Sequence, residues 1–121
     1  MVVLIDDSVD VHRLLKARLR TEPIDLTVFA DGQQGIEFCA KNRPALVLLD
    51  LDMPVMDGFA VLRALRANPA TVNTSVVVLS GLSDSQDKVA AFDLGATDYV
   101  TKPFDFSELR AACAGACARS G

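Results

Sequence analysis

The chain has 121 residues, of which 50% are hydrophobic and 23% are charged, so length and composition predict one globular domain with a single core. The formal net charge of −4 argues against direct binding of nucleic acid, because no basic stripe is available to neutralise phosphates. No apolar run approaches the roughly 20 residues that span a bilayer. Three cysteines and one histidine favour neither a disulfide framework nor a zinc site, so we expect a cytoplasmic protein with reduced cysteines and no membrane contact.

Five short apolar runs predict β-strands, and segments with apolar residues at helical spacing separate them. The runs, in chain order, are Val2–Ile5, Leu26–Phe29, Ala45–Leu49, Ser75–Leu79 and Asp98–Thr101. The second run alternates between apolar and polar residues more than the first, which predicts a strand near the edge of a sheet. The first, third and fourth runs are the most apolar, so we expect these three strands to be central.

Cap and breaker residues mark the ends of the predicted helices. Asp31-Gly32 turns the chain into the second helix, and Ser107 is positioned to cap the fifth. The fourth helix is expected from Ser83 to Leu94, followed by Gly95 with its backbone dihedral angles in the left-handed region. Strands that alternate with helices imply a parallel sheet with right-handed crossovers. The sequence therefore predicts one doubly wound α/β domain over residues 1–121, with helices on both faces.

Charged and hydroxyl side chains follow four of the predicted strands. They are Asp6-Asp7, Asp50, Ser80 and Lys102, and parallel strands bring such positions to one edge of the sheet. Crowded carboxylates repel one another, by ~4 kcal/mol for two unit charges ~4 Å apart at an effective dielectric of about 20. Such a group binds either protons or a hard cation, and ligands that are all oxygen favour Mg²⁺.

The lysine and the hydroxyl extend this chemistry to a phosphoryl group. Lys102 offers a point positive charge and Ser80 a hydrogen bond, both suited to phosphoryl oxygens, with Asp50 as the nucleophile. Taken singly, each residue has a simpler interpretation: an aspartate after a strand is usually a helix cap, and a lysine there is usually solvated. Their joint occurrence at the ends of four strands favours a phosphoryl-transfer site.

The whole chain resembles the receiver domains of two-component response regulators. The matching residues are Asp6-Asp7, Asp50 with M-P-V-M-D-G shortly after it, Ser80-Gly81, Tyr99 and Lys102-Pro103-Phe104. The resemblance implies a flavodoxin-like fold with five parallel strands in the order 2-1-3-4-5, in agreement with the three most apolar runs being central. It also implies a switch rather than a classical enzyme, one that catalyses only its own aspartyl phosphorylation and dephosphorylation.

The resemblance assigns a role to each site residue. Asp50 would accept the phosphoryl group from a sensor histidine kinase or a histidine phosphotransfer protein. Asp6, Asp7 and Asp50 would hold Mg²⁺ together with the backbone carbonyl of Asp52, with Asp6 acting largely through water. Lys102 would pair with the phosphoryl group.

The resemblance also implies a switch that connects the site to an output surface. Ser80, which precedes Gly81, would move to hydrogen-bond the phosphoryl group, and Tyr99 would turn inward with that move. Pro103 would follow a cis peptide bond. The output would reach another domain or a partner through the face formed by the fourth helix, the fifth strand and the fifth helix.

Two alternatives to this interpretation remain open from the sequence. Asp50-Leu51-Asp52 also resembles the D-x-D of haloacid-dehalogenase-type phosphatases, which use an aspartyl-phosphate and Mg²⁺. In that family the D-x-D opens the fold, whereas here another acidic pair precedes it. A second alternative is a scaffold of this fold that is not phosphorylated, although every site residue is present. The chain is either a stand-alone receiver or a part of a longer regulator.

Overall fold

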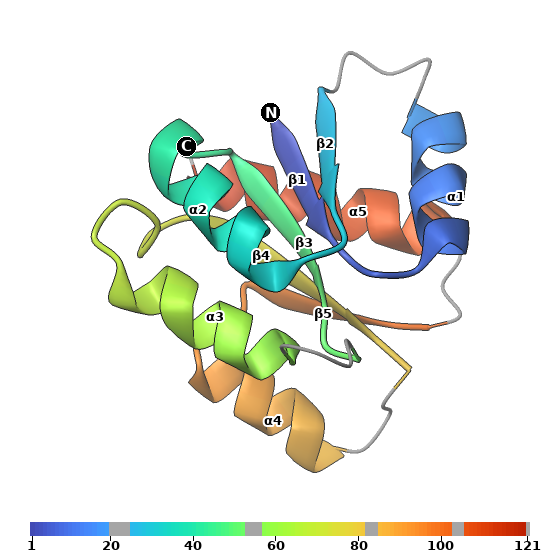
Figure 1. The fold of residues 1–121 in the computed structure, drawn as a ribbon. Coiled ribbons are helices and arrows are strands. Elements are labelled where there is room, and N and C mark those ends of the chain that lie inside the picture. The colour runs from blue at the N-terminus through green and yellow to red at the C-terminus, as the bar shows by residue number, and fades with distance from the viewer. Residues whose placement is uncertain (20–24, 53–56, 82–84, 103–105, 121) are drawn as a thin grey trace.

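The computed structural model describes residues 1–19, 25–52, 57–81, 85–102 and 106–120. Within them, parallel strands form one sheet in the order β2-β1-β3-β4-β5, as expected (Figure 1). The strands are β1 (Val2–Ile5), β2 (Leu26–Phe29), β3 (Leu46–Asp50), β4 (Ser75–Ser80) and β5 (Asp98–Thr101). Every residue of β3 and β4 is buried, whereas β2 is half-buried along its length. The central strands are covered on both faces, which explains why they are the most apolar ones.

Helices cover both faces of the sheet, so the prediction of a doubly wound fold is confirmed (Figure 1). In the described part of the chain the helices are α1 (Val9–Leu19), α2 (Gly32–Asn42), α3 (Gly58–Ala67), α4 (Ser85–Asp93) and α5 (Phe106–Ser120). Leu15 of α1 and Leu109 of α5 pack on one face, while α2, α3 and α4 pack on the other. Of the described helices, none combines the length and the apolar character needed to cross a bilayer.

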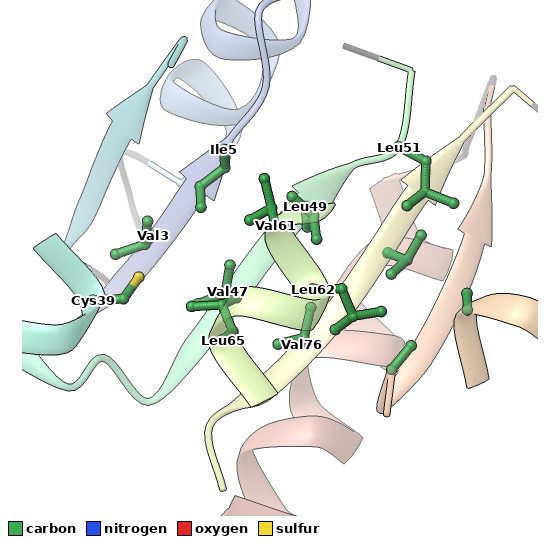
Figure 2. Packing of buried hydrophobic residues seen from close by; sticks show 13 residues of the cluster. Val3, Ile5, Cys39, Val47, Leu49, Leu51, Val61, Leu62, Leu65 and Val76 are labelled. Carbon is green, nitrogen blue, oxygen red and sulfur yellow. The ribbon is translucent and has the colours of Figure 1, made fainter. Parts of the chain in front are cut away.

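The core consists of two hydrophobic layers, because successive strand side chains point to opposite faces of the sheet. In β3, Val47 and Leu49 face the α2–α3–α4 side, whereas Leu46 and Leu48 face α1 and α5. Figure 2 shows the first layer, where Leu62 and other side chains of α3 pack against β3, with β1 and β4 on either side. Each fully buried leucine contributes ~1.5–3 kcal/mol, so these layers hold the strand ends in place.

Side-chain and backbone caps end the helices where the sequence indicated. Asp31 caps α2 by accepting a hydrogen bond from the N–H of Gln33 at 2.8 Å. Gly95 follows α4 with a φ of 101°, and the N–H of Ala96 donates to the carbonyl oxygen of Ala91. This six-residue closure is a Schellman motif, which places glycine in the left-handed region.

Two predicted helix ends differ from the structure. The helix α5 already begins at Phe106, so Ser107 lies inside its first turn and the prediction of Ser107 as the cap was wrong. The helix α4 ends at Asp93, one residue earlier than predicted, because Leu94 belongs to the capping turn. The expected start of α4 at Ser83 lies outside the described residues.

Candidate functional site

The parallel register brings the predicted polar residues to one edge of the sheet. Asp50 ends β3 in register with Leu79 of β4. Asp6 directly follows β1, Ser80 ends β4 and Lys102 directly follows β5. The four strands carry their polar ends to the same side because all of them run in the same direction. The predicted convergence is therefore present in the fold.

Lys102 connects two buried carboxylates across the sheet. Its Nζ atom lies 3.1 Å from Oδ1 of Asp50 and 3.3 Å from Oδ2 of Asp6. Its backbone N–H donates to the carbonyl oxygen of Ser80 at 2.7 Å, which fixes the start of the side chain beside β4. Asp6 and Asp50 are only 0% and 2% exposed, so an ammonium at this distance is needed to stabilise their charge.

Burial and neighbouring charges shift the pKa values of this group. Burial raises the pKa of Asp6, and repulsion by Asp50 adds to that rise, although the Ser8 N–H and Lys102 act in the opposite direction. Burial by itself would lower the pKa of Lys102, but attraction to Asp6 and Asp50 outweighs it, and the pKa is raised. The lysine is therefore a permanent cation at neutral pH, while one carboxylate is destabilised by its surroundings.

Hydrogen bonds from the chain after β1 orient Asp6. The N–H of Ser8 donates to Oδ1 of Asp6 at 2.8 Å, and Nε2 of His12 bonds to the backbone carbonyl oxygen of Asp6. The role of His12 in this turn was not predicted, although it is the only histidine in the chain.

Three carboxylates form a group that fits a hard divalent cation. One oxygen from each of Asp6, Asp7 and Asp50 lies within 4.8 Å of the others. Asp6 and Asp50 are buried and Asp7 is exposed, so the group is in contact with solvent through Asp7. Ligands that are all oxygen suit Mg²⁺ or Ca²⁺ rather than zinc.

The side chain of Asp52 makes contacts that the sequence analysis missed. Its Oδ1 atom accepts a hydrogen bond from the Ser80 hydroxyl at 3.1 Å, and its Oδ2 atom accepts one from the Gly81 N–H at 2.9 Å. Its own N–H donates to Oδ1 of Asp50 at 3.0 Å. The sequence signal is an acidic residue two positions after Asp50, a side chain expected to repel phosphate or to orient water, but the pattern does not predict its contact with Ser80 and Gly81.

Tyr99 lies on β5 beside the end of β4. Burial raises the pKa of its phenol, while a side-chain hydrogen bond with Ser80 acts in the opposite direction. The Nζ atom of Lys88 in α4 lies 5.6 Å from the centre of the Tyr99 ring, within range of a cation–π interaction. Tyr99 therefore contacts both the edge of the site and helix α4.

A glycine lets α3 approach the site closely. A Cβ atom added to Gly58 would lie 2.5 Å from the backbone carbonyl oxygen of Asp50 and 2.5 Å from Cα of Leu51. Asp57 directly before it caps the helix by accepting from the Ala60 N–H at 2.8 Å. Pro103 and residues 53–56 lie outside the described part of the chain.

The fold and the site define a doubly wound α/β domain with an acidic, lysine-bearing site at the carboxyl edge of its sheet. Residues 2–114 match the family described as the response regulator receiver domain. The chain belongs to this family, whose members are phosphorylation-dependent switches of two-component signal transduction. The phosphatase alternative has no support from this match.

Similar proteins agree with this assignment. The DNA-binding dual master transcriptional regulator RpaA of Synechocystis is 37% identical over 110 residues, which cover 91% of this chain and 46% of RpaA. The transcriptional regulatory protein PrrA of Mycobacterium tuberculosis is 40% identical over 108 residues, which cover 89% of this chain and 46% of PrrA. The chain thus spans about half the length of these transcriptional regulators.

A magnesium-bound receiver domain is among the similar solved structures. It is the receiver domain of the sensor histidine kinase PA1611 from Pseudomonas aeruginosa, with a magnesium ion coordinated in its active site cleft. It is 26% identical, superposes with a TM-score of 0.87, and the match covers 97% of this chain and 96% of that domain. Receiver domains commonly bind Mg²⁺, and they interact with sensor histidine kinases.

Proposed function

We propose that Asp50 is the residue that accepts the phosphoryl group. The observation that carries this proposal is the position of Asp50 at the end of a fully buried central strand, with Lys102 3.1 Å from its Oδ1 atom. An oxygen of Asp50 attacks the phosphorus of a phosphohistidine on a sensor kinase or a histidine phosphotransfer protein. A P–O bond forms as the P–N bond breaks, and the electron pair of that bond leaves with the imidazole.

The neighbours of Asp50 position this reaction. Lys102 and the Asp52 N–H bind Oδ1 of Asp50 and orient the carboxylate. Asp6, Asp7, Asp50 and the backbone carbonyl of Asp52 would hold Mg²⁺, which neutralises phosphoryl charge when bound. Lys102 then binds a phosphoryl oxygen, because an ammonium is a point charge without a fixed partner geometry. The same site later catalyses the hydrolysis of the phosphoryl group from Asp50.

Residues at the same edge of the sheet transmit the phosphorylation signal to the output surface. Ser80 and the backbone of Gly81 bind the phosphoryl group, and Tyr99 changes position with Ser80. The face of α4, β5 and α5 carries the result to an output domain or partner. Exposed Val89 and Phe92 on α4 are suited to such a contact. The chain would be the single receiver domain of a cytoplasmic, longer regulator.

Mass spectrometry of the whole chain tests the acceptor. Incubation with acetyl phosphate and Mg²⁺ should add one phosphoryl group to the wild type and none to Asp50→Asn. The matched control is Asp57→Asn, because Asp57 is exposed, and asparagine caps a helix as well as aspartate does. This control should be labelled like the wild type. Labelling of Asp50→Asn at the wild-type level would show that the acceptor is another residue.

A further inference from the structure

The carboxylate of Asp52 accepts hydrogen bonds from two donors at the edge of the site. The Ser80 hydroxyl and the Gly81 N–H each donate to a different oxygen of Asp52, at 3.1 and 2.9 Å. Asp52 is two residues from Asp50 in sequence, and its own N–H is bonded to the Asp50 carboxylate. Asp52 thus places a second acidic group against two neutral donors at the end of β4, the strand next to the one that carries Asp50.

A phosphoryl group on Asp50 would need the same donors. It carries about −1.5 to −2 charges and three acceptor oxygens, which is more than Lys102 satisfies alone. Ser80 ends the strand next to β3, so among the described residues its hydroxyl and the following N–H are uncharged donors on the β4 side of Asp50. A donor that serves the carboxylate of Asp52 is not available to a phosphoryl oxygen in the same geometry.

We propose that Asp52 is a positioning residue that competes with the phosphoryl group for Ser80 and Gly81, and so sets how readily the domain enters its phosphorylated state. This inference rests on the proposed function of Asp50. The contacts of Asp52 stabilise the unphosphorylated arrangement of the β4 end. Phosphorylation must exchange both hydrogen bonds, and a negatively charged side chain must leave a site that gains negative charge.

The competition extends to Tyr99. Ser80 takes part in a hydrogen bond with Tyr99 as well as with Asp52, and Lys88 of α4 lies over the Tyr99 ring. Withdrawal of Asp52 therefore changes the surroundings of the only tyrosine in the chain, even before any phosphoryl group is present.

The first test is NMR of the metal-free, unphosphorylated protein labelled with ¹⁵N-glycine. The chain has 7 glycines, so the Gly81 resonance can be assigned and followed. In Asp52→Ala the Gly81 amide proton should move upfield and exchange with solvent about tenfold faster, whereas Gly58 should be unchanged. A Gly81 amide that neither shifts nor exchanges faster in Asp52→Ala would overturn the proposed contact, whatever the phosphorylation assays show.

The second test is a double-mutant cycle read by tyrosine fluorescence during titration with beryllofluoride and Mg²⁺. Beryllofluoride stands in for the phosphoryl group, so its midpoint concentration reports the competition. Asp52→Ala should lower the midpoint about tenfold, and the same change in a Ser80→Ala background should lower it by less than about threefold. An equal factor in both backgrounds would indicate charge repulsion alone and would refute competition for Ser80.

The tests separate this inference from the proposed function. If the wild type binds no beryllofluoride and gains no mass from acetyl phosphate, both proposals are wrong. If the wild type responds to both reagents but Asp52→Ala has the wild-type midpoint, Asp50 remains the acceptor and only the competition is refuted. The beryllofluoride midpoint of Asp52→Asn should fall between those of the wild type and Asp52→Ala, because an amide oxygen retains one acceptor without the charge.

Discussion

Removal of the exposed carboxylate of Asp7 should have opposite effects with and without magnesium. Without the metal, Asp7→Asn should stabilise the domain, because it removes repulsion from Asp6 and Asp50. At 4.8 Å, the upper limit of these separations, each repulsion amounts to about 0.9 kcal/mol at a dielectric of ~80 and about 3.5 kcal/mol at ~20. Asp7 is exposed, so the lower figure applies and the two pairs together give about 1–2 kcal/mol.

Magnesium should remove or reverse the stability advantage of Asp7→Asn over the wild type. Magnesium at about 100 times its dissociation constant stabilises the folded protein by about 2.7 kcal/mol, and only a chain that binds it gains this. Under the proposed site, Asp7→Asn would lose one ligand and would keep little of that gain. In saturating Mg²⁺ the wild type should therefore equal or exceed the variant in stability, whereas without metal the variant should be the more stable one.

Thermal unfolding with and without Mg²⁺ measures both effects. The variant should melt about 4–8 °C above the wild type in chelator, given roughly 4 °C per kcal/mol for a domain of this size. Asp10→Asn is the matched control, since Asp10 is also exposed but lies outside the carboxylate group. It should leave the response to Mg²⁺ unchanged. A variant that is less stable in chelator, or that gains as much from Mg²⁺ as the wild type, would refute the reasoning.

Two further predictions concern residues away from the site. Arg66→Met should lower the free energy of unfolding by about 2–4 kcal/mol. Its guanidinium donates to the carbonyl oxygens of Gly95, Thr71, Val72 and Thr74. The exposed Arg63→Met should cost less than about 0.5 kcal/mol in the same urea titration, and equal losses would contradict this role of Arg66. Burial raises the pKa of Cys39 from 9.0 to about 11, so this thiol favours folding below pH 9.0 and that contribution is lost as the pH rises through 11. Cys39→Ala should abolish up to about 2.7 kcal/mol of alkaline destabilisation in urea titrations, and an unchanged pH dependence would refute this.

The apolar pattern of the sequence was sufficient to identify the central strands and the edge where the site lies, whereas the full strand order came from the family resemblance. Uninterrupted apolar runs mark strands that are covered on both faces, and the alternation of Leu26–Phe29 marks a strand that is not. Since parallel strands end on the same side, Asp6, Asp50 and Lys102 were expected at one edge of the sheet once their strands were identified. Helix ends were less certain, as Ser107 illustrates, because several residues near a terminus are able to cap it.

The tertiary structure decided which donors and acceptors pair across the chain. Asp52 meets Ser80 across 28 residues of sequence, and Arg66 meets Gly95 across 29. Periodicity and cap residues report only on neighbours along the chain, within a turn of helix or a pleat of strand. A contact between two loop ends also depends on the exact path of the backbone and on which rotamer reaches the partner. The sequence therefore determined that acidic groups gather at this edge, and only the fold decided that the carboxylate of Asp52 lies on Ser80 and Gly81.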